Sequence, residues 1–443
     1  MTSREALVAT TRFGLGPRPG ELALAAGDPK GWLLAQLTGP IEPLATSEPL
    51  PDGRAAMLSF MQGREGEDEA LRRQIRREGA ATWRLEAATR TRHAIRTARP
   101  ILERWVLFWS SHLTVSARQR PVVAGLVGAF EREAIRPNVL GSFHTLLRAT
   151  ATHQAMLVYL DNVRSVGPAS TFGQRRGSGL NENYARELLE LHTLGVDGGY
   201  RQADVTELAR ILTGWSVAPR QRADGGAFAF LRGVHEPGAK RFLERDYQEA
   251  GMAEGEQALS LLATHPATAR HIATKLARHF VADEPPPAVV QRLTEAFMTS
   301  GGDLAHLAQA LVTTPEALAL PLVKIRTGND YLVACLRALD HVPEDPNLVR
   351  ALTLLGQPPF GAPSPAGWPD TALDWSAPDM LLQRLEWAAS LAARHGASTD
   401  PEAIFEGTIA PVADVDSRRA ILGAGSRAEA LTLLLGSPLF QRR

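Results

Sequence analysis

Apolar residues recur along most of this chain at the three-to-four-residue spacing of helices that bury one face. A strand-like pattern is confined to a short segment, Phe228–Val234. We find no repeat of fixed period and no boundary sharp enough to separate independent units. The pattern predicts an all-α fold. It would be a single large multi-helix body over residues 1–443, with long ordered loops and at most a small β-hairpin at Phe228–Val234.

Three stretches between the helical segments are rich in residues that favour turns and loops. They are a Pro-rich link at residues 40–55, a Gly/Ser-rich segment at 167–179 that we expect to be a mobile loop, and a Pro/Gly/Trp loop at 356–378. Trp368 and Trp375 in the last loop either stack on a sugar or a partner protein or fold back into the core. A long helical pattern at Met57–Ala98 contains Gly79, where we expect a break.

The clearest helical pattern runs from Asn181 to Leu194. Asn181 is a favourable N-cap residue, and Gly195 is a favourable residue just beyond the C-terminus. Glu182, Arg186 and Glu190 lie together on the polar face at spacings of four residues, which is typical of an exposed ladder of ion pairs.

Glu187 differs from these residues because it borders the apolar stripe. A half-buried carboxylate there either pairs with a cation, for which Arg210 is a candidate, or has a raised pKa that suits a general acid or base. Asp204 and Glu207 stand three residues apart before an apolar run. That spacing predicts a capping box, in which Asp204 caps the helix and Glu207 reaches back, and paired catalytic carboxylates are the alternative.

The charge balance narrows the classes of function. Lys plus Arg and Asp plus Glu both total 48 in 443 residues, which argues against a general nucleic-acid-binding protein. The arginine-rich segment Leu71–Arg104 is either a patch for nucleic acid or anionic lipid or, as we favour, a solvated helix paired with acidic neighbours. No window is long and apolar enough for a membrane span.

Known chemical signatures are few. The single cysteine, Cys335, lies in an apolar helical pattern and is expected to be a small buried hydrophobic residue. Neither H-E-x-x-H nor a cysteine-rich zinc pattern occurs, and there is no phosphate-binding loop or G-x-S-x-G elbow. The sequence therefore names no metal and no cofactor.

Several histidines have polar or helix-terminal settings. His112 follows an aromatic stretch and is either a core histidine or a site residue. His235 lies in a loop five residues before Lys240, which could anchor an anion. His265 precedes a proline and is expected to cap a helix, whereas His192 lies near a helix C-terminus, where a cationic imidazole is favourable.

Blocks of sequence spread over nearly the whole chain resemble a bacterial family called domain of unknown function 1800. The segments that carry the resemblance are Arg12–Leu22, Glu103–Ser116, Asn181–Tyr200, Ala203–Trp215, His235–Lys240, His265–Pro286 and Pro365–Thr371. The resemblance implies a helical bacterial protein of a family in which many members are exported. It also implies that its gene often neighbours that of a second uncharacterised family, whose product is a candidate partner.

The chain departs from the family pattern in two places. Ser110 stands where members commonly carry a histidine, so only His112 remains of a two-histidine pattern. The N-terminus has neither an export signal nor a twin-arginine pair. The sequence as written is therefore expected to be cytoplasmic, or periplasmic if a leader was removed.

Two functions follow from these observations. The first is a helical protein that binds a partner or takes part in an assembly, and the family resemblance relates it to the bacterial cell envelope. We expect no nucleic-acid partner, and the sequence does not specify an oligomeric state. The alternative is a hydrolase or transferase with an acid/base cleft. The residues assigned to that cleft are Glu187, His235 and His112 as catalytic, and Arg186, Lys240, Asn183 and Asp204 as binding.

Overall fold

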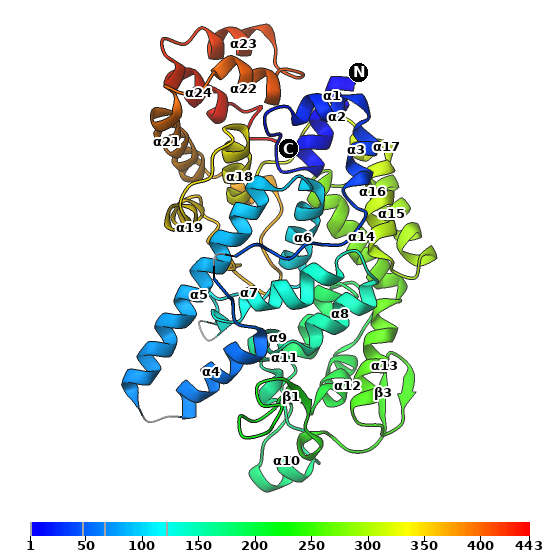
Figure 1. The fold of residues 1–443 in the computed structure, drawn as a ribbon. Coiled ribbons are helices and arrows are strands. Elements are labelled where there is room, and N and C mark those ends of the chain that lie inside the picture. The colour runs from blue at the N-terminus through cyan, green and yellow to red at the C-terminus, as the bar shows by residue number, and fades with distance from the viewer. Residues whose placement is uncertain (1, 47, 66–67, 121–122) are drawn as a thin grey trace.

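The computed structural model describes residues 2–46, 48–65, 68–120 and 123–443 and is built mainly from helices (Figure 1). In the first half they are α1 (Thr2–Val8), α2 (Glu21–Gly27), α3 (Pro29–Ala35), α4 (Gly53–Glu65), α5 (Glu69–Arg96), α6 (Pro100–His112), α7 (Val127–Phe130), α8 (Phe143–Thr152), α9 (Gln154–Tyr159), α10 (Thr171–Arg176), α11 (Asn183–Glu187) and α12 (Gln202–Leu212). In the second half they are α13 (Met252–Ala263), α14 (Pro266–Phe280), α15 (Pro287–Thr299), α16 (Leu304–Thr313), α17 (Pro315–Leu318), α18 (Gly328–Ala338), α19 (Asp345–Leu354), α20 (Ala372–Trp375), α21 (Pro378–His395), α22 (Pro401–Thr408), α23 (Val415–Leu422) and α24 (Arg427–Gly436).

Strands make up a minor part of the described chain. The strand β1 (Trp215–Val217) pairs antiparallel with β2 (Phe228–Phe230), which lies inside the segment predicted to be a strand. A second hairpin joins β3 (Lys240–Phe242) to β4 (Arg245–Tyr247). The prediction of a mostly α fold with a small hairpin is confirmed, and the second hairpin is an addition that the sequence pattern did not reveal.

The helix α5 contradicts one predicted boundary. It continues through Gly79 without a break, and the long helical pattern is divided instead into α4, which ends at Glu65, and α5, which starts at Glu69. Gly79 lies against the backbone of Gly125. The glycine therefore marks a close approach of two chain segments and not the end of a helix.

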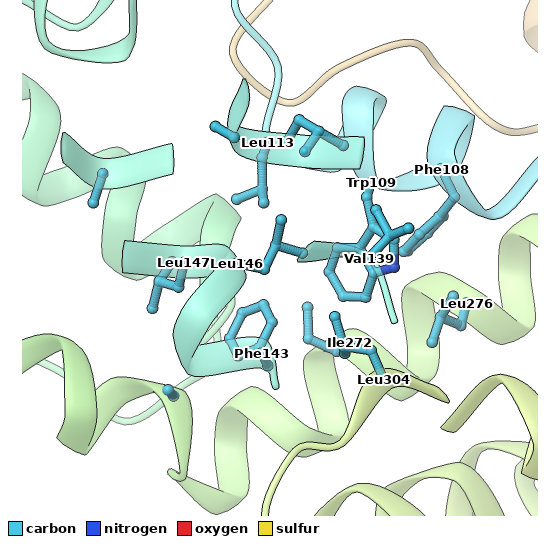
Figure 2. Packing of buried hydrophobic residues seen from close by; sticks show 14 of the residues in the cluster. Phe108, Trp109, Leu113, Val139, Phe143, Leu146, Leu147, Ile272, Leu276 and Leu304 are labelled. Carbon is cyan, nitrogen blue, oxygen red and sulfur yellow. The ribbon is translucent and has the colours of Figure 1, made fainter. Parts of the chain in front are cut away.

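The helix α6 lies at the centre of the main hydrophobic core because it is apolar on nearly all sides. Its first residue is proline, which is favourable at that position. Trp109 packs on Phe143 of α8, with 5.8 Å between their ring centroids. Figure 2 shows these rings beside Ile272 of α14 and Leu304 of α16, so the core joins helices from both halves of the chain.

A second cluster of buried apolar residues joins α18 to the C-terminal helices α21, α22 and α24. These C-terminal helices gather with α23 at one end of the molecule in Figure 1, and β1, β3 and α10 lie at the other end. Cys335 is buried in the second cluster, as predicted, and burial raises the pKa of its thiol to about 12. Across the described ranges, no helix is long and apolar enough to cross a membrane.

Candidate functional site

A polar pocket lies where α5, α6, α14 and α18 meet the segment 357–370. Its volume is about 110 Å³, so it can hold a small molecule or one end of a larger one. Phe108 and Phe360 contribute apolar surface. The ionisable side chains that line the pocket are Arg90, Arg104, His112, Lys275, His279, Asp330 and Asp370.

The helix α14 brings two of these side chains to the pocket. The His265 side chain caps the helix by accepting the N–H of Ala267 at 3.1 Å, which confirms its predicted role. Lys275 and His279 follow at a spacing of four residues, so they lie on one helix face, one turn apart. Another face of the helix buries Ile272, Leu276 and Phe280 in the core, and Lys275 and His279 both line the pocket.

The loop that carries Asp370 lies against the end of α6. Gly367 has a φ of +89°, and a Cβ at this position would collide with the carbonyl oxygen of Ser111. The backbone N–H of Trp368 donates to the Ser111 Oγ at 3.0 Å. Glycine is therefore required for the close approach that carries Asp370 to α14.

Asp370 and His279 form a carboxylate–imidazole pair. The His279 Nδ1 lies 2.8 Å from the Asp370 Oδ2, and the two side chains remain 16% and 24% exposed. Burial lowers the pKa of His279, against the opposing effect of Asp370. The imidazole is therefore neutral at neutral pH, and this contact assigns its proton to Nδ1. The His279 Nε2 is then a lone-pair acceptor; this atom is buried, and no described residue donates a hydrogen bond to it.

Two carboxylates in this region are held ionised by several cations. Burial raises the pKa of Asp370, but the hydrogen bond from His279 and the positive charges of Lys324 and Arg443 outweigh it and hold the pKa well below its usual range. Asp330 behaves in the same way, because Arg104 at 3.2 Å and Arg443 at 2.8 Å overcome its burial and lower its pKa. These carboxylates are therefore fully engaged by cations other than Lys275.

Lys275 has no hydrogen bond or ion pair with any described residue, although it lines the pocket and is partly buried. Burial lowers the pKa of its amine, Asp370 opposes that effect, and Arg278 adds to it. Among the described side chains, the network around the two aspartates holds more cations than anions. The cations are Arg104, Lys275, Lys324, Arg326 and Arg443, and the anions are Asp283, Asp330 and Asp370.

His112 lines the same pocket from the end of α6. Its Nε2 lies 3.2 Å from the carbonyl oxygen of His192, and its ring stacks on Phe108 with 5.9 Å between centroids. Burial and the nearby Lys275 lower the pKa of His112 and lower that of His192 to about 3. The predicted cationic imidazole at His192 is therefore wrong, because the ring is buried beside another positive group.

His235 and Lys240 belong to a different, buried network. The Lys240 Nζ lies 2.7 Å from one carboxylate oxygen of Glu254, and the His235 Nε2 lies 3.2 Å from the other. The Lys240 and Glu254 side chains are both fully buried. Lys240 thus has its counter-charge inside the core, which favours a structural role for it over the predicted anion anchor.

Glu187 lies in neither network. It is half-buried and makes no hydrogen bond or ion pair with a described residue, and burial together with Glu190 raises its pKa. The predicted alternative of an ion pair with Arg210 is wrong, because Arg210 binds Glu207 at 2.7 Å and lies 3.7 Å from Glu236. The other predicted alternative for Glu187, a carboxyl group with a raised pKa, agrees with this arrangement.

The remaining predicted binding residues hold the structure together. Arg186 pairs with Glu182 at 3.1 Å, and the Asn183 amide donates to a backbone carbonyl at 3.2 Å. Asp204 is the third residue of α12 and accepts two backbone N–H groups, at 2.8 and 2.9 Å. The predicted capping box is therefore displaced: Asp204 takes the position assigned to Glu207, because the helix cap is Arg201, three residues before the predicted cap.

Of the three predicted catalytic residues, only His112 lines the pocket. Sequence reasoning missed Lys275, His279 and Asp370, although all three lie in blocks that resemble the family. The sequence feature that could have revealed them is a stripe of polar residues on α14. His271, Lys275 and His279 follow one another at four-residue spacing, beside the apolar face of this amphipathic helix. Within the described part of the chain, no group of three or more His, Cys, Asp or Glu is arranged to hold a metal ion.

The fold and the pocket define a mostly helical protein with a small, cation-rich pocket. Over residues 8–442 the chain matches the family described as "Protein of unknown function (DUF1800)". The chain belongs to that family, as the resemblance predicted. No curated protein and no solved structure matches it.

Proposed function

We propose that the pocket between α6, α14 and the 367–370 loop is the active site of an enzyme that performs acid–base chemistry on a small anionic substrate. The observation that carries the proposal is the pairing of His279 with Asp370 beside Lys275, which makes no hydrogen bond or ion pair with any described residue. A carboxylate that orients a neutral imidazole is the arrangement by which proteins prepare a general base.

His279 would accept a proton through its Nε2, and the imidazolium that forms would be stabilised by Asp370. The surplus of positive charge around the pocket would be balanced by the anionic group of the substrate, because uncompensated buried charge is costly. Hydrolysis and group transfer, the reactions predicted from the sequence, both use such a base. The proposal retains His112 as a pocket residue and replaces Glu187 and His235 with His279 and Asp370.

Anion binding is the first test. Isothermal titration with inorganic phosphate and with acetate should detect one site, and Lys275→Met should weaken it at least about tenfold, equivalent to about 1.4 kcal/mol. Lys30→Met is the matched control, because Lys30 is exposed and lies outside the pocket. The proposal fails if neither anion binds, or if Lys275→Met binds both as the wild type does.

Catalysis is the second test. Nitrophenyl phosphate and nitrophenyl esters of dicarboxylic acids, which are chromogenic and carry an anionic group, would be screened with the wild type, His279→Gln and the exposed control His306→Gln. His279→Gln should lower turnover by about 100-fold or more, and His306→Gln should not. Turnover should fall as the pH drops through the pKa of His279, which lies below its ordinary value, because only the neutral ring accepts a proton. Turnover that survives His279→Gln would refute the assignment.

The partner-binding function predicted from the sequence is a second candidate, favoured by a groove between α4 and α5. The groove has a volume of about 880 Å³, and Phe60, Ile75 and Leu126 are among its apolar lining residues. Arg64 and Arg76 at its edge are exposed and have no acidic partner among the described residues. This combination suits an acidic amphipathic helix of another protein. The relation to the cell envelope comes from the family resemblance alone.

The test of this second candidate uses a synthetic amphipathic helix with either an acidic or a basic polar face. Fluorescence anisotropy should detect binding of the peptide with the acidic face to the wild type, and the double variant Arg64→Glu/Arg76→Glu should abolish this binding. Arg84→Glu, on an exposed part of α5 outside the groove lining, is the control. Equal binding of both peptides, or of the acidic peptide to all variants, would count against a specific groove.

A further inference from the structure

Lysine is rare in this chain, and its positions are informative. Only four of the 48 basic residues are lysines: Lys30, Lys240, Lys275 and Lys324. Lys30 is exposed, whereas Lys240 and Lys324 are buried against carboxylates at 2.7 and 2.6 Å. Lys275 alone combines a pocket position with the lack of any partner among the described residues. An amine can lose its proton near neutral pH, whereas a guanidinium cannot.

We propose that Lys275 is a covalent catalyst, whose amine forms an imine with the carbonyl carbon of a small substrate that also carries an anionic group. This inference rests on the proposed function, because it places the same substrate in the same pocket. It narrows the substrate class to aldehydes and ketones with a neighbouring carboxylate or phosphate. A cavity of about 110 Å³ accommodates a molecule of that size.

The surroundings of Lys275 favour its uncharged form. The ionisable groups that interact electrostatically with Lys275 are His112, His192, His271, Arg278 and Asp370. Burial lowers the pKa of each of the three histidines, so the rings are neutral at neutral pH and give Lys275 no counter-charge, whereas Arg278 is cationic. Desolvation and a neighbouring cation are the two conditions that turn a lysine into a nucleophile, and only Asp370 opposes them here.

The step balances without an oxidant or a reductant. The amine lone pair attacks the carbonyl carbon, and the C=O electron pair moves to oxygen, which takes up a proton as the nitrogen releases one. The carbinolamine then loses its hydroxyl group as water while the C=N bond forms, so amine and carbonyl give imine and water. His279 lies one turn along α14 and lines the same pocket, so in this proposal it carries the proton between nitrogen and oxygen.

Reductive trapping tests the inference in the full-length protein. The protein would be incubated with pyruvate or glyoxylate and sodium borohydride, which delivers a hydride to the imine carbon and leaves a stable secondary amine. Peptide mass spectrometry then quantifies the adduct at all four lysines. Lys275 should be modified at least about tenfold more than Lys30, because burial lowers the pKa of the Lys275 amine and leaves more of it uncharged at neutral pH. Lys240 and Lys324 are internal controls for buried amines and should remain unmodified.

Lys275→Arg separates amine chemistry from charge. It should lose the adduct completely yet still bind phosphate and pyruvate in isothermal titration, because the positive charge remains. If phosphate binds but Lys275 is modified no more than Lys30 by either carbonyl probe, Lys275 acts by charge alone. The inference then fails while the proposed function stands. If phosphate does not bind the wild type either, both fail.

Discussion

Asp330→Asn is the substitution that most directly tests the charge network beneath the pocket. Asp330 is 6% exposed and contacts two arginines, Arg104 and Arg443, which are 1% and 0% exposed. Asparagine keeps the size of the side chain but removes the negative charge. Arg443 retains Asp370 at 3.6 Å, whereas Arg104 loses its only carboxylate contact among the described residues.

The expected decrease in the free energy of unfolding depends on the contacts that Arg104 keeps after the substitution. Its Nε still donates to the Gly14 carbonyl at 2.5 Å, so one hydrogen bond survives, but the guanidinium is left in the interior without a counter-charge. Removing one partner of a buried pair typically costs about 3–5 kcal/mol. We expect a loss of about 3 kcal/mol, at the lower end of that range, because only one of the two arginines is left without a carboxylate.

Urea unfolding at pH 7, followed by circular dichroism, measures the loss. The double variant Arg104→Met/Asp330→Asn is the control and should recover part of it, because the buried cation is removed as well. The pKa of Asp330 is lower when folded than when unfolded, so its contribution is full above its unfolded pKa and is lost as the pH falls through its folded pKa. A loss below about 1 kcal/mol at pH 7, or one that does not diminish under strongly acidic conditions, would refute the reasoning.

Three further predictions concern other parts of the fold. Gly367→Ala should destabilise the protein by about 1–3 kcal/mol and weaken phosphate binding in isothermal titration, because a Cβ there meets the Ser111 carbonyl at a positive φ; unchanged binding would mean that the loop does not depend on this contact. Gly79→Ala should stabilise the protein by about 0.5–1 kcal/mol in urea unfolding, since Gly79 is interior to α5 and a Cβ there would only touch Gly125 at 4.0 Å. Lys240→Met should cost about 3–5 kcal/mol in the same assay by leaving the Glu254 carboxylate without its buried cation, and Lys240→Met/Glu254→Gln should recover part of the loss; no recovery would argue against the pair.

Much of the fold could be predicted because helical periodicity is a local signal. The helix pattern, the hairpin at Phe228–Phe230 and the buried Cys335 all follow from neighbouring residues. The errors occur where distant segments decide the outcome. Gly79 looks like a helix break, yet it packs on Gly125, which lies far away in the sequence. The spacing of Asp204 and Glu207 predicts the cap of α12 three residues too late, because Asp204 is the third helical residue and also accepts an N–H from the distant β3–β4 turn.

The candidate site was harder to predict for the same reason. His279 and Asp370 are 91 residues apart, so no spacing rule joins them. His112 was identified because an aromatic stretch precedes it, and Glu187 was correctly assigned to the edge of an apolar stripe, where its pKa is raised. Burial next to an apolar stripe, however, does not say which pocket a side chain faces.

The charges around the pocket constrain how a substrate would be oriented. An anion bound directly to Lys275 would stabilise the protonated amine and oppose imine formation. The anionic group must therefore lie nearer another cation, and Arg104 fits because it lines the pocket and its Nη2 has no hydrogen-bond partner among the described residues. With the anion held by Arg104, the carbonyl carbon is left for Lys275 and the proton transfers for His279. Phosphate and acetate carry no ketone or aldehyde carbon, so this restriction does not apply to them, and they are expected to contact the protonated amine of Lys275, whose charge Lys275→Met removes.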